Sequence, residues 1–555
     1  MKTKPLYYQT DAYNKGKDAD LFALLADMGV GKTKIAIDIC DYKHTIGVCD
    51  RVLVIAPSGV HGQWLNEQYP AHCSHEYEGF LYKSNSTLKF VRALDSFLWR
   101  AKESTKLLVM SMNIEAFTQT KGIDLASRFL DTAIQGCAIL IDEASIIKTP
   151  DIVTVKNVKK LRDRYATAFR CVLTGTPAAK GPINMWSIFD FLKKNYMGCS
   201  YVVFRMTHTV IFTKSLRIKG RLVNIKDDLT RDIFDKVKLH IRNNSKDGDI
   251  QEDAVEYIRN KFGLSYNNFW IIANSKEFVR YKNLDRIHAR IAPDTFSIKK
   301  SDCLDLPPKT YQVIDFKLNA HQKELIHNLE KYAVATYQGE ELTLEIRAML
   351  GLRVLQICGG FFAHHTDIEG IFDTKPVEGV NAKLEYIKKD LVEVGFQQSI
   401  IWSVYTKEIE LIYNTLKEDY SVGMLYGGVV DDAREEVVTK FKSGEIQHLI
   451  SNPAVGGFGY NFQNATVQYW YSRNYRTELR IQAEDRIYRI GTKVSPVYKD
   501  LLYSIPLERK VLDTLKAEQE INEVFISQRT TSEVYNEANR QPLAYATLED
   551  IFRIK

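Results

Sequence analysis

A short glycine-bearing loop between an apolar run and a helix-like run constrains this chain more than any other feature of its sequence. Residues 21–25 read LFALL, residues 26–33 read ADMGVGKT, and Ile35, Ala36 and Ile39 follow at helical spacing. Glycines let backbone N–H groups turn inward around an anion, and the N-terminus of the next helix adds its positive dipole end. The pattern predicts a strand, a phosphate-binding loop and a helix, which together begin an α/β unit.

The residues of this loop have defined tasks in binding a nucleoside triphosphate. The Lys32 ammonium reaches the β- and γ-phosphates, and the Thr33 hydroxyl is a ligand for Mg²⁺. Ala26 stands at the position of the first glycine of the general pattern. ATP and Mg²⁺ are therefore the predicted cofactors. The candidate nucleotide-binding residues are Met28, Gly29, Val30, Gly31, Lys32, Thr33 and Lys34.

Two adjacent acids follow another apolar run. Residues 138–141 read AILI, and Asp142 and Glu143 come next. Parallel α/β sheets place ligands at the carboxyl ends of their strands, so we expect these acids beside the phosphate loop. We predict that Asp142 holds Mg²⁺ through water and that Glu143 orients and deprotonates the attacking water. Together with Lys32 they form the predicted catalytic set of the first half of the chain.

Short apolar, β-branched runs alternate with helix-like segments in two separate stretches. Near-continuous apolar strands are typical of parallel sheets that helices cover on both faces. The sequence therefore predicts two consecutive α/β units. Their expected strands are residues 51–56, 107–110, 138–141 and 171–173 in the first, and 399–402, 449–451 and 466–470 in the second.

Phosphoryl transfer also needs positive charge near the γ-phosphate. Gln482, Arg486 and Arg489 are spaced at i, i+4 and i+7, which would place them on one face of a helix. An amphipathic surface helix with exposed arginines is the alternative interpretation. Because the segment belongs to the second α/β unit, its arginines could act as fingers on an ATP bound between two lobes. We therefore predict that all three residues are catalytic.

Charge and hydropathy limit the classes of partner. The formal net charge of +6 is too small to identify one. Residues 205–246 hold eleven Lys or Arg and four Asp, which fits either a solvated face or a surface that follows phosphates. No apolar run approaches the roughly 20 residues of a membrane helix, and residues 1–9 lack a signal-like stretch. We expect a soluble, cytoplasmic protein of a bacterial cell without membrane contacts.

The eight cysteines contain no CxxC pair, and several lie in apolar segments, so reduced core thiols are expected. His72, Cys73 and His75 could hold part of a metal site. Three crowded ligands without an obvious fourth make a poor zinc site, however.

The motifs, taken in order, resemble Swi/Snf-type DNA translocases of helicase superfamily 2, in a minimal phage or bacterial form. The resemblance covers almost the whole chain. Ser145 departs from it, because the family usually has a His there, and so does the Lys299–Lys300 pair, where the family tends to have arginines. The matching segments are LYYQ (6–9), LADMGVGKT (25–33), VIAP (54–57), QWLNE (63–67), DEAS (142–145), LTGTP (173–177), NMWSIFDFL (184–192), LPPK (306–309), IWS (401–403), YGG (426–428) and NPAVGGFGYNF (452–462).

The resemblance implies further site residues. Gln9 corresponds to the family's adenine-recognising glutamine, and Gly457 is a candidate nucleotide contact that lies in a nucleic-acid-binding motif. Both lobes of the family grip the backbone of one strand, which positions a motor without reading sequence. For each single residue, a purely structural turn remains the alternative. The candidate nucleic-acid contacts are Ser58, Gly59, Gln63, Trp64, Thr174, Ser403, Tyr426, Gly427, Gly428, Gly459 and Asn461.

The fold that the resemblance implies is α/β, with two RecA-like parallel-sheet lobes, helical insertions between them and a C-terminal helical brace. The basic insertion would embrace the second strand of a duplex. The expected division is lobe 1 at 1–195, a basic helical protrusion at 196–305, the lobe 2 entry and a helical protrusion at 306–370, lobe 2 at 371–505 and the brace at 506–555.

The expected function is an ATP-dependent translocase on double-stranded DNA that remodels or displaces bound complexes or branched DNA, in replication, repair or transcription. A strand-separating helicase on DNA or RNA is the first alternative, in which single-stranded DNA or RNA would be the partner. An ATP-gated DNA clamp without significant turnover is the second. One chain carries a complete ATP site, so a monomer is expected to suffice, and no protein partner follows from the sequence.

Overall fold

The computed structural model describes residues 1–83, 87–178, 181–210, 216–218, 221–223, 260, 280–337, 344–365, 372–395, 397–429, 431–457 and 459–526. The chain divides into two compact units. Unit 1 comprises residues 1–27 and 31–299 and the segment that begins at Glu520, and unit 2 comprises residues 28–30 and 300–519. None of the described helices combines the length and the apolar character needed to cross a bilayer.

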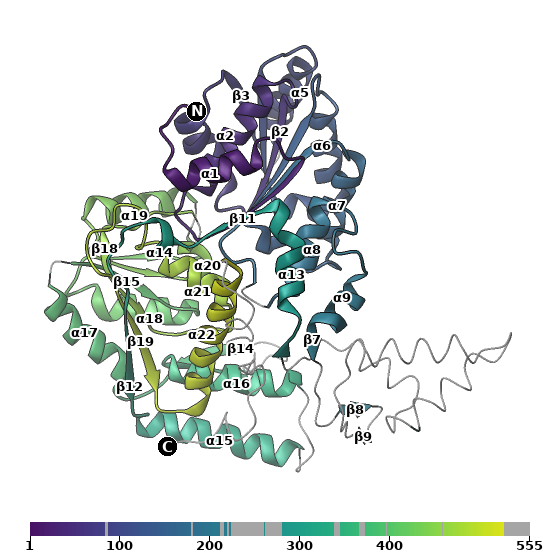
Figure 1. Ribbon diagram of the computed structural model, residues 1–555. Coiled ribbons are helices and arrows are strands. Elements are labelled where there is room, and N and C mark those ends of the chain that lie inside the picture. The colour runs from purple at the N-terminus through teal and green to yellow at the C-terminus, as the bar shows by residue number, and fades with distance from the viewer. Residues whose placement is uncertain are drawn as a thin grey trace. The chain divides into compact units, whose positions relative to one another are not determined.

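Unit 1 is built on a seven-stranded sheet in which all neighbouring strands are parallel. The strand order is β11-β1-β6-β5-β2-β4-β3. Of these strands, β2, β3 and β11 are labelled in Figure 1. In the register, Leu25 is paired with Thr174 and Asp142 with Leu173, so the carboxyl ends of β1, β6 and β5 lie side by side. The strands are β1 (Leu21–Ala26), β2 (Arg51–Ala56), β3 (Tyr77–Leu81), β4 (Leu107–Asn113), β5 (Cys137–Asp142), β6 (Phe169–Thr174) and β11 (Thr295–Ile298).

Helices cover both faces of this sheet. Leu24 and Val54 point into a core that contains the apolar residues of α2, whereas Leu25 and Leu53 point into a second core with α5, α6, α7 and α8. Burial on both faces explains why these strands are apolar along their whole length. The helices are α1 (Tyr7–Gly16), α2 (Lys32–Thr45), α3 (His61–Gln63), α4 (Tyr69–His72), α5 (Leu88–Ala101), α6 (Thr120–Leu130), α7 (Val153–Arg164), α8 (Asn184–Leu192), α9 (Tyr201–His208) and α13 (Leu284–Ile291), with a π-helix at Trp64–Gln68 and 3₁₀ turns at Ile114–Thr118, Ala144–Ile147 and Ala292–Asp294.

Unit 2 repeats the architecture with six parallel strands in the order β12-β19-β18-β15-β17-β16. One core holds Ile401 and Tyr469 with α17 and α18, and the other holds Trp402 and Trp470 with α19 and α21. The strands are β12 (Thr310–Phe316), β15 (Gln398–Trp402), β16 (Val422–Leu425), β17 (His448–Ser451), β18 (Ala465–Trp470) and β19 (Val497–Tyr503). The helices are α14 (Lys300–Cys303), α15 (Ala320–Tyr337), α16 (Leu344–Cys358), α17 (Ala382–Val394), α18 (Thr406–Leu416), α19 (Asp431–Ser443), α20 (Pro453–Gly456), α21 (Thr477–Glu484) and α22 (Pro506–Ile526).

Three short antiparallel pairs complete the described structure. They are β7 (Thr209–Val210) with β10 (Arg280–Tyr281), β8 (Leu216–Ile218) with β9 (Arg221–Val223), and β13 (Phe361–His365) with β14 (Phe372–Pro376). Most of the basic stretch 205–246 lies outside the described residues, as does 527–555. The expected roles of these segments as a protrusion and as the end of a brace therefore stay predictions.

The two α/β units predicted from the sequence are confirmed, and each of the eight predicted strands is present, including the strand before the phosphate loop. Strand β11 was not predicted, because its four residues, TFSI, lie in a stretch that is otherwise basic and helix-like. The predicted single helix through Gln482, Arg486 and Arg489 is wrong. Helix α21 ends at Glu484, and both arginines lie in the turns that follow it.

Candidate nucleotide site

The loop between β1 and α2 has the backbone of a phosphate-binding turn. Gly29 and Gly31 have φ values of 78° and 86°, in the left-handed region that favours glycine. Gly31 is the N-cap of α2, a helix of 14 residues. The strand, loop and helix predicted from the sequence are therefore present, and the loop ends where the helix dipole favours an anion.

Lys32 folds back over the loop that precedes it. Its Nζ donates to the carbonyl oxygens of Ala26 at 2.8 Å and Asp27 at 3.0 Å. The ammonium therefore lies at the carboxyl end of β1. Lys34, one residue beyond Thr33, instead pairs with Asp38 within α2, with 2.6 Å between Nζ and Oδ2. The Lys34 charge is thus paired inside the helix, and its contribution to nucleotide binding stays a prediction.

Gln9 reaches the same loop from α1. Its Oε1 accepts a hydrogen bond from the Leu6 backbone N–H at 3.0 Å, which fixes the amide at the start of the helix. Its Nε2 lies against Gly31, where an added Cβ would be 2.4 Å away. The structure thus brings Gln9 to the phosphate loop, and the φ of 86° at residue 31 favours glycine there.

Asp142 is the last residue of β5 and is partly buried at the sheet edge. Its Oδ2 accepts a hydrogen bond from the indole Nε1 of Trp64 at 2.8 Å, and its Oδ1 accepts one from the backbone N–H of Glu143 at 3.0 Å. Burial raises the pKa of Asp142 to about 6, against the lowering effects of the Trp64 hydrogen bond and the Lys32 charge. Asp142 and Lys32 are therefore close enough to interact.

Glu143 is held by three hydroxyl groups. Its Oε1 accepts hydrogen bonds from Thr174 at 2.8 Å, Thr176 at 3.1 Å and Ser145 at 3.2 Å. Its backbone is left-handed, with a φ of 56°, which is uncommon for a residue with a side chain. This conformation turns the Glu143 side chain away from the strand direction and toward the end of β6. Ser145, where the resembling family has a His, contributes a hydrogen bond.

The donors at this site fit Mg²⁺. Each Asp142 oxygen accepts one hydrogen bond, and a carboxylate has about four acceptor positions, so the group can still hold a metal-bound water. Thr33 adds a hydroxyl in the first turn of α2. A few oxygen ligands, completed by phosphates and water, are what Mg²⁺ requires. Among the described residues, which include 72–75, no group of three or more His, Cys, Asp or Glu forms a metal cluster.

In unit 2, the residues after α21 hold the two candidate arginines. The Arg486 guanidinium donates from Nε to the carbonyl oxygen of Gln482 at 3.0 Å and from Nη1 to that of Tyr460 at 3.1 Å. Arg489 donates from Nε to the carbonyl oxygen of Asp485 at 3.2 Å. Backbone carbonyls thus orient both side chains although the helix has ended. Their action on a nucleotide stays a prediction, as does that of Gln482.

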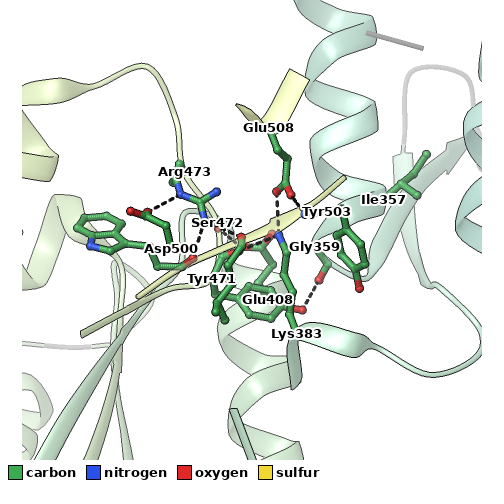
Figure 2. Close-up of polar contacts among 12 residues, drawn as sticks. Ile357, Gly359, Lys383, Glu408, Tyr471, Ser472, Arg473, Asp500, Tyr503 and Glu508 are labelled. Atoms are coloured by element: carbon green, nitrogen blue, oxygen red, sulfur yellow. Dashed lines mark hydrogen bonds and ion pairs between the residues drawn. The ribbon is translucent and has the colours of Figure 1, made fainter. Parts of the chain in front are cut away.

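Unit 2 also contains a group of buried polar residues that we call the Glu408 cluster, namely Lys383, Ser403, Glu408, Ser472 and Glu508. Figure 2 labels Lys383, Glu408, Ser472 and Glu508 of this cluster. Glu408 Oε2 accepts hydrogen bonds from the hydroxyls of Ser403 and Ser472. Lys383 Nζ lies 2.7 Å from Glu508 Oε1. Burial raises the pKa of Glu408 to about 7. These five residues come from distant parts of the sequence, and of them only Ser403 lay in a motif that the sequence analysis singled out.

The Glu408 cluster fixes the turn after β15, where nucleic-acid contacts were expected. The Ser472 hydroxyl accepts a hydrogen bond from the Val404 N–H at 2.9 Å. Asn452 Nδ2 donates to the carbonyl oxygen of Val404 at 2.8 Å. The segments around Ser403 and Asn452 are thus joined through buried polar groups.

Three of the candidate nucleic-acid contacts have side chains that are buried and hydrogen-bonded within the protein, and their contact with nucleic acid stays a prediction. Trp64 is 1% exposed and donates to Asp142, so its indole supports the acidic site. The Thr174 and Ser403 side chains are also buried, because their hydroxyls are committed to Glu143 and Glu408. The remaining candidates are at least partly exposed and stay predictions: Ser58, Gly59, Gln63, Tyr426, Gly427, Gly428, Gly459 and Asn461.

Gly457 has a structural reason to be glycine. It is buried, and an added Cβ would be 2.2 Å from the carbonyl oxygen of Pro453. Its nucleotide contact stays a prediction. Thr176 and Asn522, by contrast, belong to the surroundings of Glu143 but were not predicted. Thr176 lies in LTGTP (173–177), one of the segments that resemble the family, whereas Asn522 lies in a helix without a motif.

Two family profiles match most of the chain. The sequence profile of the SNF2-related domain matches residues 21–357, and that of the helicase conserved C-terminal domain matches residues 382–491. A Bacillus subtilis protein named as a candidate ATP-dependent helicase/translocase, YwqA, is 22% identical over 91% of this chain and 46% of its own length. The TATA-binding protein-associated factor MOT1 of Saccharomyces cerevisiae is 22% identical over 92% of this chain and 26% of its own length.

The chain thus spans less than half the length of these two relatives. Among solved structures, the Sulfolobus solfataricus SWI2/SNF2 ATPase core in complex with dsDNA covers 98% of this chain and 98% of its own, with 18% sequence identity and a TM-score of 0.34.

Proposed function

Because the chain belongs to the SNF2-related domain family of helicase-like enzymes, we propose that it hydrolyses ATP in order to move along double-stranded DNA. In doing so it displaces or remodels bound complexes or branched DNA. The observation that carries the proposal is the Glu143 carboxylate, which three hydroxyls hold at the edge of the sheet that carries the phosphate loop. The relative named as a helicase/translocase supports the reaction class.

In the proposed reaction, the Lys32 ammonium and the loop N–H groups bind the β- and γ-phosphates. Thr33 and Asp142 would hold Mg²⁺, which neutralises phosphate charge when it is bound. Glu143 Oε1 is occupied by three donors, and we assign its Oε2 to the attacking water. Water attacks the γ-phosphorus, its proton passes to Glu143, and the bond to the β-phosphate oxygen breaks to give ADP and phosphate.

Arg486 and Arg489 are the proposed arginine fingers. Each guanidinium is directed by a backbone carbonyl, which restricts its rotamers before nucleotide arrives. Fingers of this kind contribute about 10³–10⁵ to turnover in related phosphoryl transfers. If they reach the nucleotide from the second lobe, hydrolysis depends on closure of the lobes, and this dependence would couple ATP turnover to movement.

The test is ATP hydrolysis without nucleic acid and then with duplex DNA, single-stranded DNA and RNA, with Glu143→Gln as the blank. We expect stimulation by duplex DNA to exceed that by the other two. Stronger stimulation by a single strand, together with displacement of a labelled strand, would favour a helicase. Binding of ATP without turnover under every condition would favour a clamp and contradict the proposal.

A further inference from the structure

The turn that follows β6 determines where the Glu143 carboxylate lies. Two of the three hydroxyls on Glu143 Oε1 come from Thr174 and Thr176. The Thr176 backbone N–H also donates to the Thr174 hydroxyl at 3.0 Å, so the two threonines move together. Any displacement of this turn is therefore passed to the carboxylate that is the proposed base.

A single side-chain amide holds this turn. Asn522 Nδ2 donates to the carbonyl oxygen of Gly175 at 3.0 Å, and Asn522 Oδ1 accepts a hydrogen bond from the Ala178 N–H at 3.0 Å. One amide thus pairs with an acceptor and a donor that lie three residues apart. Asn is suited to this task because its side chain offers both functions at a fixed separation.

The hydrogen bonds between Asn522 and the turn are buried, so their loss would be costly. Asn522 is 2% exposed and Ala178 is fully buried. A buried backbone N–H or C=O that loses its partner is costly, so the turn depends on the amide. The neighbouring residue provides a contrast, because Glu523 is about half exposed and its Oε2 lies 3.4 Å from Lys299 Nζ. At 3.4 Å and with its carboxylate about half exposed to solvent, this ion pair is screened and contributes little.

Asn522 belongs to the last turns of α22, more than 300 residues from the turn that it holds, and both lie in unit 1. We propose that Asn522 is a positioning residue for ATP hydrolysis, whose amide fixes the Gly175–Ala178 turn and, through Thr174 and Thr176, the carboxylate of Glu143. The inference rests on the proposed function, because it requires Glu143 to act on the attacking water.

The proposal makes a kinetic distinction. A displaced base slows the chemical step, whereas the phosphate loop that binds the nucleotide is unchanged. Asn522→Leu removes both hydrogen bonds with little change in volume, and Asn522→Asp keeps the acceptor for Ala178 but places a carboxylate oxygen against the Gly175 carbonyl. We expect kcat for ATP, with saturating duplex DNA, to fall about tenfold in each variant while KM changes less than about twofold.

Glu523→Gln is the matched control, since it changes the residue next to Asn522 and removes the ion pair between Glu523 and Lys299. Its kcat and KM should equal those of the unchanged chain. Thermal unfolding of every variant is measured in parallel. If Asn522→Leu does not fold, the more conservative Asn522→Asp decides the question.

A double-mutant cycle with Thr176→Val separates positioning from general destabilisation. If Asn522 acts through the turn, Asn522→Asp combined with Thr176→Val lowers kcat no further than the more damaging single change. Multiplicative effects in the double variant, or wild-type kcat in a folded Asn522 variant, would overturn the inference. If the unchanged chain itself shows no ATP turnover, the proposed function fails instead, so the two failures are distinguishable.

Discussion

Asp142 is the last residue of β5 in the first sheet and Glu408 lies in α18, the helix after β15 of the second sheet, and the surroundings of these two acids differ. Both carboxylates have a raised pKa, to about 6 for Asp142 and about 7 for Glu408, and burial is the first cause in each case. Asp142 is only partly buried, and N–H groups bind both of its oxygens. Glu408 is fully buried, and among the described residues no group bonds to its Oε1.

The difference teaches that a perturbed pKa does not by itself mark a reactive group. Functional sites and structural ion-pair networks both shift acid pKa values. Access separates the two regions, since Asp142 lies beside a phosphate loop and can still accept from a metal-bound water. Glu408 is closed in by Ser403, Ser472 and the backbone at Gly359. We therefore expect changes in the first region to alter turnover and changes in the second to alter stability.

The largest effect is expected from Glu143→Gln. An amide accepts the three hydroxyl hydrogen bonds but cannot take a proton from water, so ATP turnover should fall by about a thousandfold. ATP affinity, measured by titration with a fluorescent nucleotide, should stay close to that of the unchanged chain. A large loss of ATP affinity would show that Glu143 contributes to nucleotide binding and not only to turnover.

Gly359→Ala tests the closed region through its packing. An added Cβ would be 1.9 Å from Glu408 Oε1, and the fully buried carboxylate is held through its other oxygen by two serine hydroxyls. We expect a loss of about 3 kcal/mol in the free energy of unfolding of unit 2, the upper end for overpacking. Denaturant titration measures it. Gly427→Ala is a control for glycine loss in unit 2, because nothing lies within 4 Å of its Cβ position and its φ is not in the left-handed region.

The pH dependence of stability should show the titration of Glu408. The folded protein holds the Glu408 proton up to pH about 7, whereas an unfolded chain releases it near the usual value of 4.5. The contribution of Glu408 to the free energy of unfolding is thus fully present below pH 4.5 and is lost as the pH rises from there to 7. Glu408→Gln removes this titration and should flatten the decline between pH 5 and 8 by on the order of 2 kcal/mol. If the free energy of unfolding of Glu408→Gln depends on pH as it does in the unchanged chain, a group other than Glu408 titrates in this range.

The smallest effect is expected from Ser145→Ala. Its hydroxyl is the longest of the three hydrogen bonds to Glu143, at 3.2 Å, and two threonines remain. Loss of one hydrogen bond to a carboxylate should lower kcat by about threefold, with KM unchanged. Steady-state ATPase assays resolve this. A loss as large as that of Glu143→Gln would instead give Ser145 a coupling role of its own.

The features that depend on short-range spacing could be predicted from the sequence. The apolar strands, the phosphate loop and the adjacent acids each follow from spacing within about ten residues, and the structure places them together. The helix through Arg486 was predicted wrongly, because the spacing continued beyond Glu484 while the backbone did not. Hydrogen bonds from Arg486 and Arg489 to backbone carbonyls replace the helical ladder there.

Long-range partners could not be predicted from the sequence. Trp64 and Asp142 are 78 residues apart, and Asn522 and Gly175 are 347 apart, and no local pattern joins either pair. The Glu408 cluster has the same character, since Lys383 and Glu508 meet across 125 residues. Such contacts depend on how elements pack, and packing is decided by the whole core and not by a motif.

The left-handed backbone of Glu143 has a consequence for how this sequence can change. A residue with a Cβ costs on the order of 1 kcal/mol or more in that conformation, and glycine or asparagine adopts it more easily. Selection for thermal stability alone would therefore move position 143 away from glutamate. A stabilised descendant of this chain with glycine at position 143 would keep the fold and lose the carboxylate, so thermostability screens without an activity assay would favour inactive molecules.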